Sequence, residues 1–132
     1  NKIMGRYYSG DIEGKFWFGI QSSNSADRFG VIGDYPPYLE YYFNEDHIPC
    51  VKKELLKIKK TYGEDIKLMK KFMEKNNSYN YDMLIKFCEE NGKPKTETEI
   101  KQILEELADY ELGEKILKHL EENGECFFSA EL

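Results

Sequence analysis

Two acidic residues and one arginine near the start of the chain are the side chains best suited to chemistry. One residue separates Asp11 from Glu13, so an extended backbone would place both carboxylates on the same face. Convergent carboxylates can transfer protons or bind a hard cation, and the guanidinium of Arg28 could bind an anion. We therefore take Asp11, Glu13 and Arg28 as candidate catalytic or ligand-binding residues of a polar site formed by loops within residues 8–34.

The histidines and cysteines do not form a metal-binding pattern. The chain has two histidines and three cysteines, which are His47, His119, Cys50, Cys88 and Cys126. No two of these residues lie at the close spacing that zinc sites favour, although Cys50 follows His47 by three residues and could share a helix face with it. An odd number of widely spaced cysteines is typical of free thiols in a reducing compartment. We therefore expect no metal and a cytoplasmic, intracellular protein.

The glycines near the N-terminus do not form a nucleotide-binding loop. Gly5, Gly10, Gly14 and Gly19 match neither of the common spacings that cradle phosphates, and Gly14 precedes a strand-like segment rather than a helix. Turns and bulges account for glycines of this kind. The sequence therefore predicts no cofactor.

Aromatic residues are concentrated in the first part of the chain. A strand with one covered face buries only alternate residues, so consecutive rings such as those in 16–18 and 41–43 should leave some rings on the other face. The candidate binding residues come from this part of the chain: Tyr7, Tyr8, Trp17, Tyr38 and Tyr42. The alternative is that both faces are covered and these rings belong to the core.

The net charge of −6 is unevenly distributed. Residues 47–96 hold twelve Lys or Arg against seven Asp or Glu, whereas residues 97–132 hold three against eleven. We interpret the two regions as solvated helix faces that attract each other, and the alternative is that one of them docks a charged partner. The acidic net charge argues against nucleic acid as a partner, although a basic helix over 52–71 could bind one.

Three segments have the aromatic and β-branched composition of strands and are bounded by turn-forming residues. They are residues 13–20, 38–43 and 125–131. Three further segments have the apolar spacing of helices: about 47–76, 81–91 and 97–123. Gly63 is a weak point where the first helix could bend or split, and Asp109 and Gly113 predict a kink or a break in the third.

The order of these segments predicts the architecture and limits the function. We expect a single α+β domain over residues 1–132, with a small antiparallel sheet and the helices packed on one face. The apolar runs are far shorter than the roughly 20 residues that span a bilayer, so we expect no membrane association. The leading hypothesis is an interaction protein that binds a protein partner, or a second copy of itself, through the aromatic β surface or the charged helices. A small-ligand site or enzyme in 8–34 and nucleic-acid binding through 52–71 are the alternatives.

Overall fold

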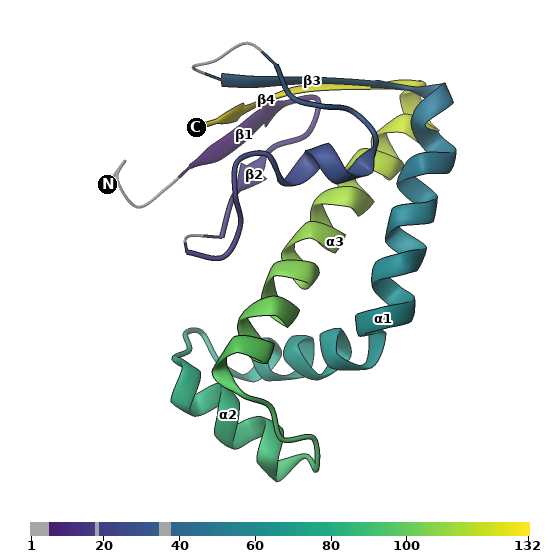
Figure 1. The fold of residues 1–132 in the computed structure, drawn as a ribbon. Coiled ribbons are helices and arrows are strands. Elements are labelled where there is room, and N and C mark those ends of the chain that lie inside the picture. The colour runs from purple at the N-terminus through teal and green to yellow at the C-terminus, as the bar shows by residue number, and fades with distance from the viewer. Residues whose placement is uncertain (1–5, 18, 35–37) are drawn as a thin grey trace.

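The computed structural model describes residues 6–17, 19–34 and 38–132, and it combines a four-stranded antiparallel sheet with three α-helices (Figure 1). In chain order the elements are β1 (Tyr7–Gly10), β2 (Gly14–Lys15), the 3-10 helix η2 (Ser25–Phe29), β3 (Tyr38–Asn44), the 3-10 helix η3 (Glu45–His47), α1 (Ile48–Lys75), α2 (Tyr81–Glu90), α3 (Glu97–Asn123) and β4 (Glu125–Glu131). The predicted α+β fold with a small antiparallel sheet is confirmed. None of the described helices is long and apolar enough to cross a membrane.

The last strand of the chain lies in the interior of the sheet. The strand order is β2-β1-β4-β3, and every neighbouring pair is antiparallel. β4 pairs with β3 over its whole length, from Tyr38 opposite Glu131 to Asn44 opposite Glu125. On its other side β4 pairs with β1, where Tyr8 is opposite Ala130. The sheet therefore joins residues from both ends of the described chain.

The first predicted strand is the least accurate expectation. Within 13–20 only Gly14–Lys15 pairs as a strand, and the longer partner is Tyr7–Gly10, which the sequence pattern missed. The chain turns after Trp17, because the backbone N–H groups of Ile20 and Gln21 both donate to the Trp17 carbonyl and Gly19 adopts a φ of 75°. Phe18 lies outside the described residues. Aromatic composition indicated a strand here, but the local turn overrides it.

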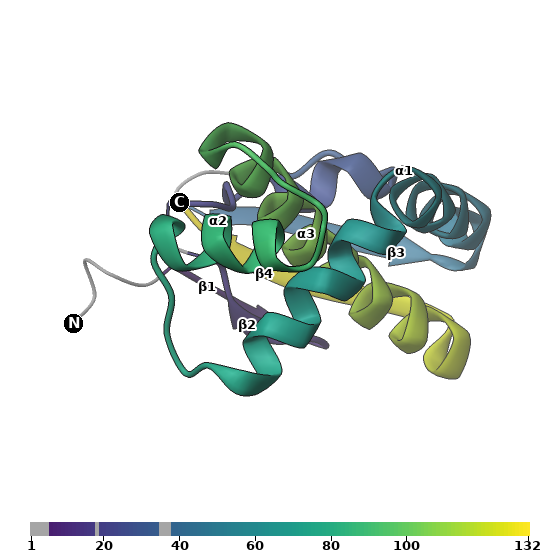
Figure 2. The ribbon, with the colours of Figure 1, turned by 90° about the horizontal axis from the view of Figure 1, so that it is seen from below.

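α1 changes direction about half-way along its length, as Figures 1 and 2 show, while its helical hydrogen bonding continues from Ile48 to Lys75. Gly63 lies in the middle of this helix in sequence. A glycine gives the helix less intrinsic stability than an alanine would, so the bend occurs in the region that the sequence identified as weak. The helix bends there and does not split.

α3 runs without a break from Glu97 to Asn123, so the predicted two-helix break near Asp109 and Gly113 does not occur. Both residues serve packing instead. A Cβ atom on Gly113 would lie 2.5 Å from the Phe29 ring and 2.7 Å from Leu55, so the glycine lets these side chains approach the helix backbone closely. Asp109 is buried and accepts hydrogen bonds from two neighbouring segments. The apolar pattern of α3 is therefore interrupted at Asp109 and Gly113 because both residues contact other segments, and the interruption does not end the helix.

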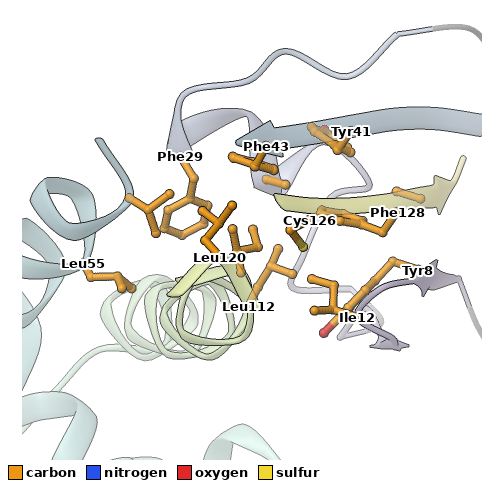
Figure 3. Close-up of a cluster of buried hydrophobic side chains, with 14 of the residues drawn as sticks. Tyr8, Ile12, Phe29, Tyr41, Phe43, Leu55, Leu112, Leu120, Cys126 and Phe128 are labelled. Atoms are coloured by element: carbon orange, nitrogen blue, oxygen red, sulfur yellow. The ribbon is translucent and has the colours of Figure 1, made fainter. Parts of the chain in front are cut away.

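Two clusters of buried apolar side chains stabilise the fold. The first lies between the sheet and the helices, and Figure 3 shows the aromatic rings of β1, β3 and β4 pointing toward α3. The second joins α1, α2 and α3 at the end of the molecule away from the sheet. Tyr110 packs against both clusters. Helices α1 and α3 contribute to each, so they connect the sheet to α2.

Replacing a glycine in each long helix should have opposite effects. Gly113→Ala should lower the free energy of unfolding by about 1–3 kcal/mol, because its Cβ would clash with the Phe29 ring in the core. Gly63→Ala should raise it by about 0.5–1 kcal/mol, because the nearest atom to its Cβ is Lys59 Cγ at 3.7 Å and alanine favours the helix. Urea unfolding of both variants measures the difference, and equal effects would contradict this description of the packing.

Candidate functional site

Four aromatic rings lie on the side of the sheet that faces away from the helices. Tyr7 is 50% exposed, Tyr38 50%, Tyr42 48% and Phe127 46%. In Figure 1 all three α-helices lie below the sheet, and none of the described helices covers its upper side. We call these four rings, together with the strand surface that carries them, the open face.

Strand alternation explains why these rings are exposed. The neighbours of the exposed rings point to the opposite side, where Tyr8, Tyr41, Phe43 and Phe128 are buried in the first core cluster (Figure 3). The rings of Tyr41 and Phe128 stack at a centroid distance of 5.1 Å. The helices need only one side of the sheet to complete this core, so the other side keeps its rings in solvent.

The register of the sheet sets the arrangement of the rings. Tyr42 on β3 is directly opposite Phe127 on β4, so these two rings are cross-strand neighbours. Tyr38 is directly opposite Glu131 of β4, and the backbone N–H of Tyr7 donates to the Glu131 carboxylate at 2.8 Å from the other side. Tyr7 and Tyr38 therefore flank one carboxylate, and the rings lie on three adjacent strands.

The structure brings together three of the five aromatic residues that the sequence indicated. Tyr7, Tyr38 and Tyr42 are on the open face, whereas Tyr8 is only 5% exposed and belongs to the core, because it is the inward neighbour of Tyr7. Trp17 is half-buried beside the second core cluster and is not on the open face. Sequence reasoning missed Phe127, although the consecutive rings Phe127 and Phe128 carry the same signal as the runs near the N-terminus.

Carboxylates surround the rings of the open face. The Tyr42 hydroxyl donates to Glu125 at 3.1 Å, which raises the pKa of that phenol. The Ser129 hydroxyl donates to Glu40, and the backbone N–H of Phe127 donates to Asp11 at 2.8 Å. With Glu131, these residues form a set of four anchored carboxylates, which are Asp11, Glu40, Glu125 and Glu131. Lys15 Nζ lies 5.9 Å from the centre of the Tyr7 ring.

Arg28 forms the centre of a second polar cluster, on the helix side of the molecule. Its guanidinium donates to Glu54 of α1 at 2.8 Å and, on α3, to Glu106 at 2.9 Å and Asp109 at 2.8 Å. The side-chain amide of Gln21 donates to the other oxygen of Asp109 at 2.9 Å. One cation thus joins η2 to both long helices, and its donors are already occupied.

Burial and hydrogen bonding shift the pKa values of Arg28 and Asp109 in opposite directions. Burial lowers the pKa of Arg28, but the hydrogen bonds to Glu106 and Asp109 outweigh it and the pKa is raised overall. Burial raises the pKa of Asp109, and the hydrogen bonds from Gln21 and Arg28 offset this only in part. Three carboxylates contact one guanidinium, so the cluster carries an excess of negative charge.

No polar contact among the described residues joins Asp11, Glu13 and Arg28 to one another. Arg28 bonds to α1 and α3, Asp11 bonds to β4, and only the backbone carbonyl of Glu13 has a polar contact, with Lys115 at 3.1 Å. The true partners of Arg28 come from helices that follow it in the chain by many residues. Local spacing could not reveal such long-range contacts, because helix packing alone brings them together.

A cavity of about 460 Å³ lies between the β1–β2 hairpin, Trp17 and α3. Its charged lining residues are Lys15, Lys115, Lys118, Glu111 and Glu114. Lys115 Nζ donates to the Tyr8 hydroxyl at 2.9 Å and lies 5.2 Å from the centre of that ring. The cavity adjoins the loops of the predicted polar site, but its charges come from α3 and β2. Its mixed lining has no single sign of charge that would select a ligand.

The lysines within residues 52–71 of α1 are exposed. Lys52 pairs with Glu121 of α3 at 3.5 Å, and among the ion pairs of the described residues it alone joins α1 to the acidic part of α3 through a lysine. A concavity of about 440 Å³ near Gly63 is lined by lysines, Glu64 and Asp65. The two charged regions therefore remain mostly solvated, with little direct pairing.

The thiols and the acidic side chains of residues 6–17, 19–34 and 38–132 do not form a metal centre. No group of three or more His, Cys, Asp or Glu side chains in that part of the chain is arranged to hold an ion. The three cysteines are free; Cys88 and Cys126 are buried and Cys50 is exposed. Burial raises the pKa of the Cys126 thiol to about 12, which disfavours the reactive thiolate.

No protein-family model, curated protein or solved structure matches the chain. The open face and the polar clusters of the chain itself are therefore the basis for proposing a function.

Removing the guanidinium of Arg28 should destabilise the protein strongly. Arg28→Met leaves the carboxylates of Glu106 and Asp109 without a cation, and we expect a loss of about 2–4 kcal/mol in the free energy of unfolding. Lys52→Met is the control, because it breaks an exposed ion pair to the same helix and should cost less than about 1 kcal/mol. Urea unfolding compares the two, and a similar small loss for both would show that the Arg28 cluster contributes little.

The raised pKa of Asp109 predicts a dependence of stability on pH. The folded protein holds this proton more tightly than the unfolded chain, so the stabilisation is complete below the ordinary pKa of about 4 and is lost as the pH rises through the raised value. The stability of the wild type relative to Asp109→Asn should therefore fall as the pH rises above about 4. Urea unfolding followed by Trp17 fluorescence checks this, and a relative stability that rises over this pH range contradicts it.

Proposed function

We propose that this protein is an interaction protein that binds another polypeptide through the open face of its sheet. The observation that carries the proposal is the group of four half-exposed rings on adjacent strands, on the side opposite the helices. Rings in this position contribute little to the core, and their exposure to water is unfavourable. A partner that covers these rings would remove their apolar surface from water, which favours binding.

The size of the aromatic surface supports the proposal. An aromatic side chain buries roughly 150–250 Å² when it is covered, so four half-exposed rings offer on the order of 400 Å². This is within the range of about 300–600 Å² for the largest apolar patch on a monomer, which is often functional. Tyrosine and phenylalanine are also enriched at the centres of interfaces, where charged residues are depleted.

The rigidity of the platform supports it as well. Tyr42 and Phe127 are on strands that pair over their full length, and Tyr42 is held by its hydrogen bond to Glu125. Side chains that are ordered before binding lose less conformational entropy when a partner arrives. The rings therefore form a surface that is ready to bind without rearrangement of the sheet.

The proposal includes a reducing, cytoplasmic environment. It is supported by the three free cysteines, of which Cys88 and Cys126 are buried among apolar side chains. An exposed Cys50 thiol would persist in such a compartment.

A photo-crosslinking side chain at position 42 should capture a partner polypeptide. The chain carrying the photoreactive residue in place of Tyr42 is irradiated in an extract of the cells that make it, and adducts are identified by mass. We expect discrete adducts that weaken at least about fivefold when Tyr7 and Tyr38 are both changed to threonine, because two rings of the same surface are lost. Threonine keeps the strand propensity and so preserves the sheet.

The matched control carries the photoreactive residue at position 56. Leu56 is 65% exposed on α1, so a crosslinker there samples incidental collisions at another apolar site. Adducts of equal number and mass at both positions would refute the proposed binding face. An adduct at twice the mass of 15.6 kDa would identify the partner as a second copy of the chain.

A further inference from the structure

The carboxylates of the open face form no ion pair with any residue that the structure describes. Asp11, Glu40, Glu125 and Glu131 each accept a hydrogen bond from a neutral donor, and within the described part of the chain none of them takes part in an ion pair. The carboxylates around Arg28 differ, because a guanidinium contacts each of them. Within the described residues, no ion pair neutralises the negative charge around these rings.

The anchoring hydrogen bonds fix where this charge lies. Glu131 is held by the backbone N–H of Tyr7, directly opposite Tyr38, and Glu40 is held by the Ser129 hydroxyl in the neighbouring row of the sheet. A carboxylate that is already oriented binds a cation with little further loss of side-chain entropy. The charges are therefore placed between and beside the rings.

We propose that the partner of the open face is a basic polypeptide segment, in which arginine or lysine side chains alternate with apolar ones. This inference rests on the proposed function. A guanidinium above Glu131 would meet the carboxylate and lie beside the rings of Tyr7 and Tyr38, which combines an ion pair with cation–π contacts. Apolar side chains of the same segment would cover the neighbouring Tyr42 and Phe127.

The same charges disfavour two other occupants. A symmetric dimer through this face would place the same patch on both sides of the contact and bring glutamates against glutamates. Nucleic acid would bring phosphates against them. A basic polypeptide is the partner whose charge complements this surface, while its apolar residues match the rings.

Selection from a library of random peptides displayed on phage tests the inference. The immobilised wild-type chain is the target, and peptides that also bind the Tyr42→Thr/Phe127→Thr variant are discarded. We expect the retained peptides to carry a net positive charge and to combine arginine or lysine with apolar residues. Their synthetic forms should bind more weakly as salt is raised, because exposed ion pairs are screened.

Charge-neutral variants give the second measurement. Glu40→Gln/Glu131→Gln keeps an acceptor oxygen for the Ser129 and Tyr7 donors but removes two charges, and it should weaken binding of the retained peptides about fivefold. Glu89→Gln/Glu90→Gln on α2, at the end of the molecule away from the sheet, removes the same charge and should leave binding unchanged (Figure 1).

The outcomes separate this inference from the function on which it rests. Retained peptides that are neutral or acidic, or that bind the Glu40→Gln/Glu131→Gln variant as tightly as the wild type, overturn the basic partner and leave the binding face intact. Failure to retain any peptide whose binding depends on Tyr42 and Phe127 overturns the binding face as well.

Discussion

Strand β4 pairs with β1 on one side and with β3 on the other, so the sheet is continuous only when the end of the described chain lies between two strands from its beginning. β1 and β3 do not pair with each other in this order. Tyr7 and Tyr38 share a surface because Glu131 of β4 lies between their strands. The open face is therefore a product of long-range pairing, and it cannot exist in either half of the chain alone.

The cluster around Arg28 stabilises the other side of that sheet. It attaches η2 to α1 and α3, and the next residue, Phe29, packs against the helix backbone at Gly113. The two acidic regions of the molecule thus have different physical roles. The carboxylates near Arg28 contact a guanidinium and hold helices together, whereas those of the open face pair with no described cation.

The helices and the open face occupy separate parts of the structure. The first core cluster uses the inner side of the sheet, and the second lies among α1, α2 and α3. A partner that covers the outer rings would leave both clusters unchanged. This separation explains how Tyr42 and Phe127 can serve recognition without a cost in core packing.

The sequence by itself determined the elements whose signals are local. The apolar stripe of α1 and the strands at 38–43 and 125–131 follow from side-chain periodicity and turn chemistry. The presence of exposed rings also followed from consecutive aromatic residues, since a strand cannot bury both of its faces against one layer. These features depend on residues a few positions apart.

Only the tertiary structure decided which residues meet. It placed Tyr8 in the core and Tyr7 outside, added Phe127, and gave Arg28 partners on α1 and α3 in place of Asp11 and Glu13. The local pattern gave no strand order and no register, and a shift of one residue would exchange the two faces of a strand. Packing of distant segments selects one register, because only that register buries the rings of the core.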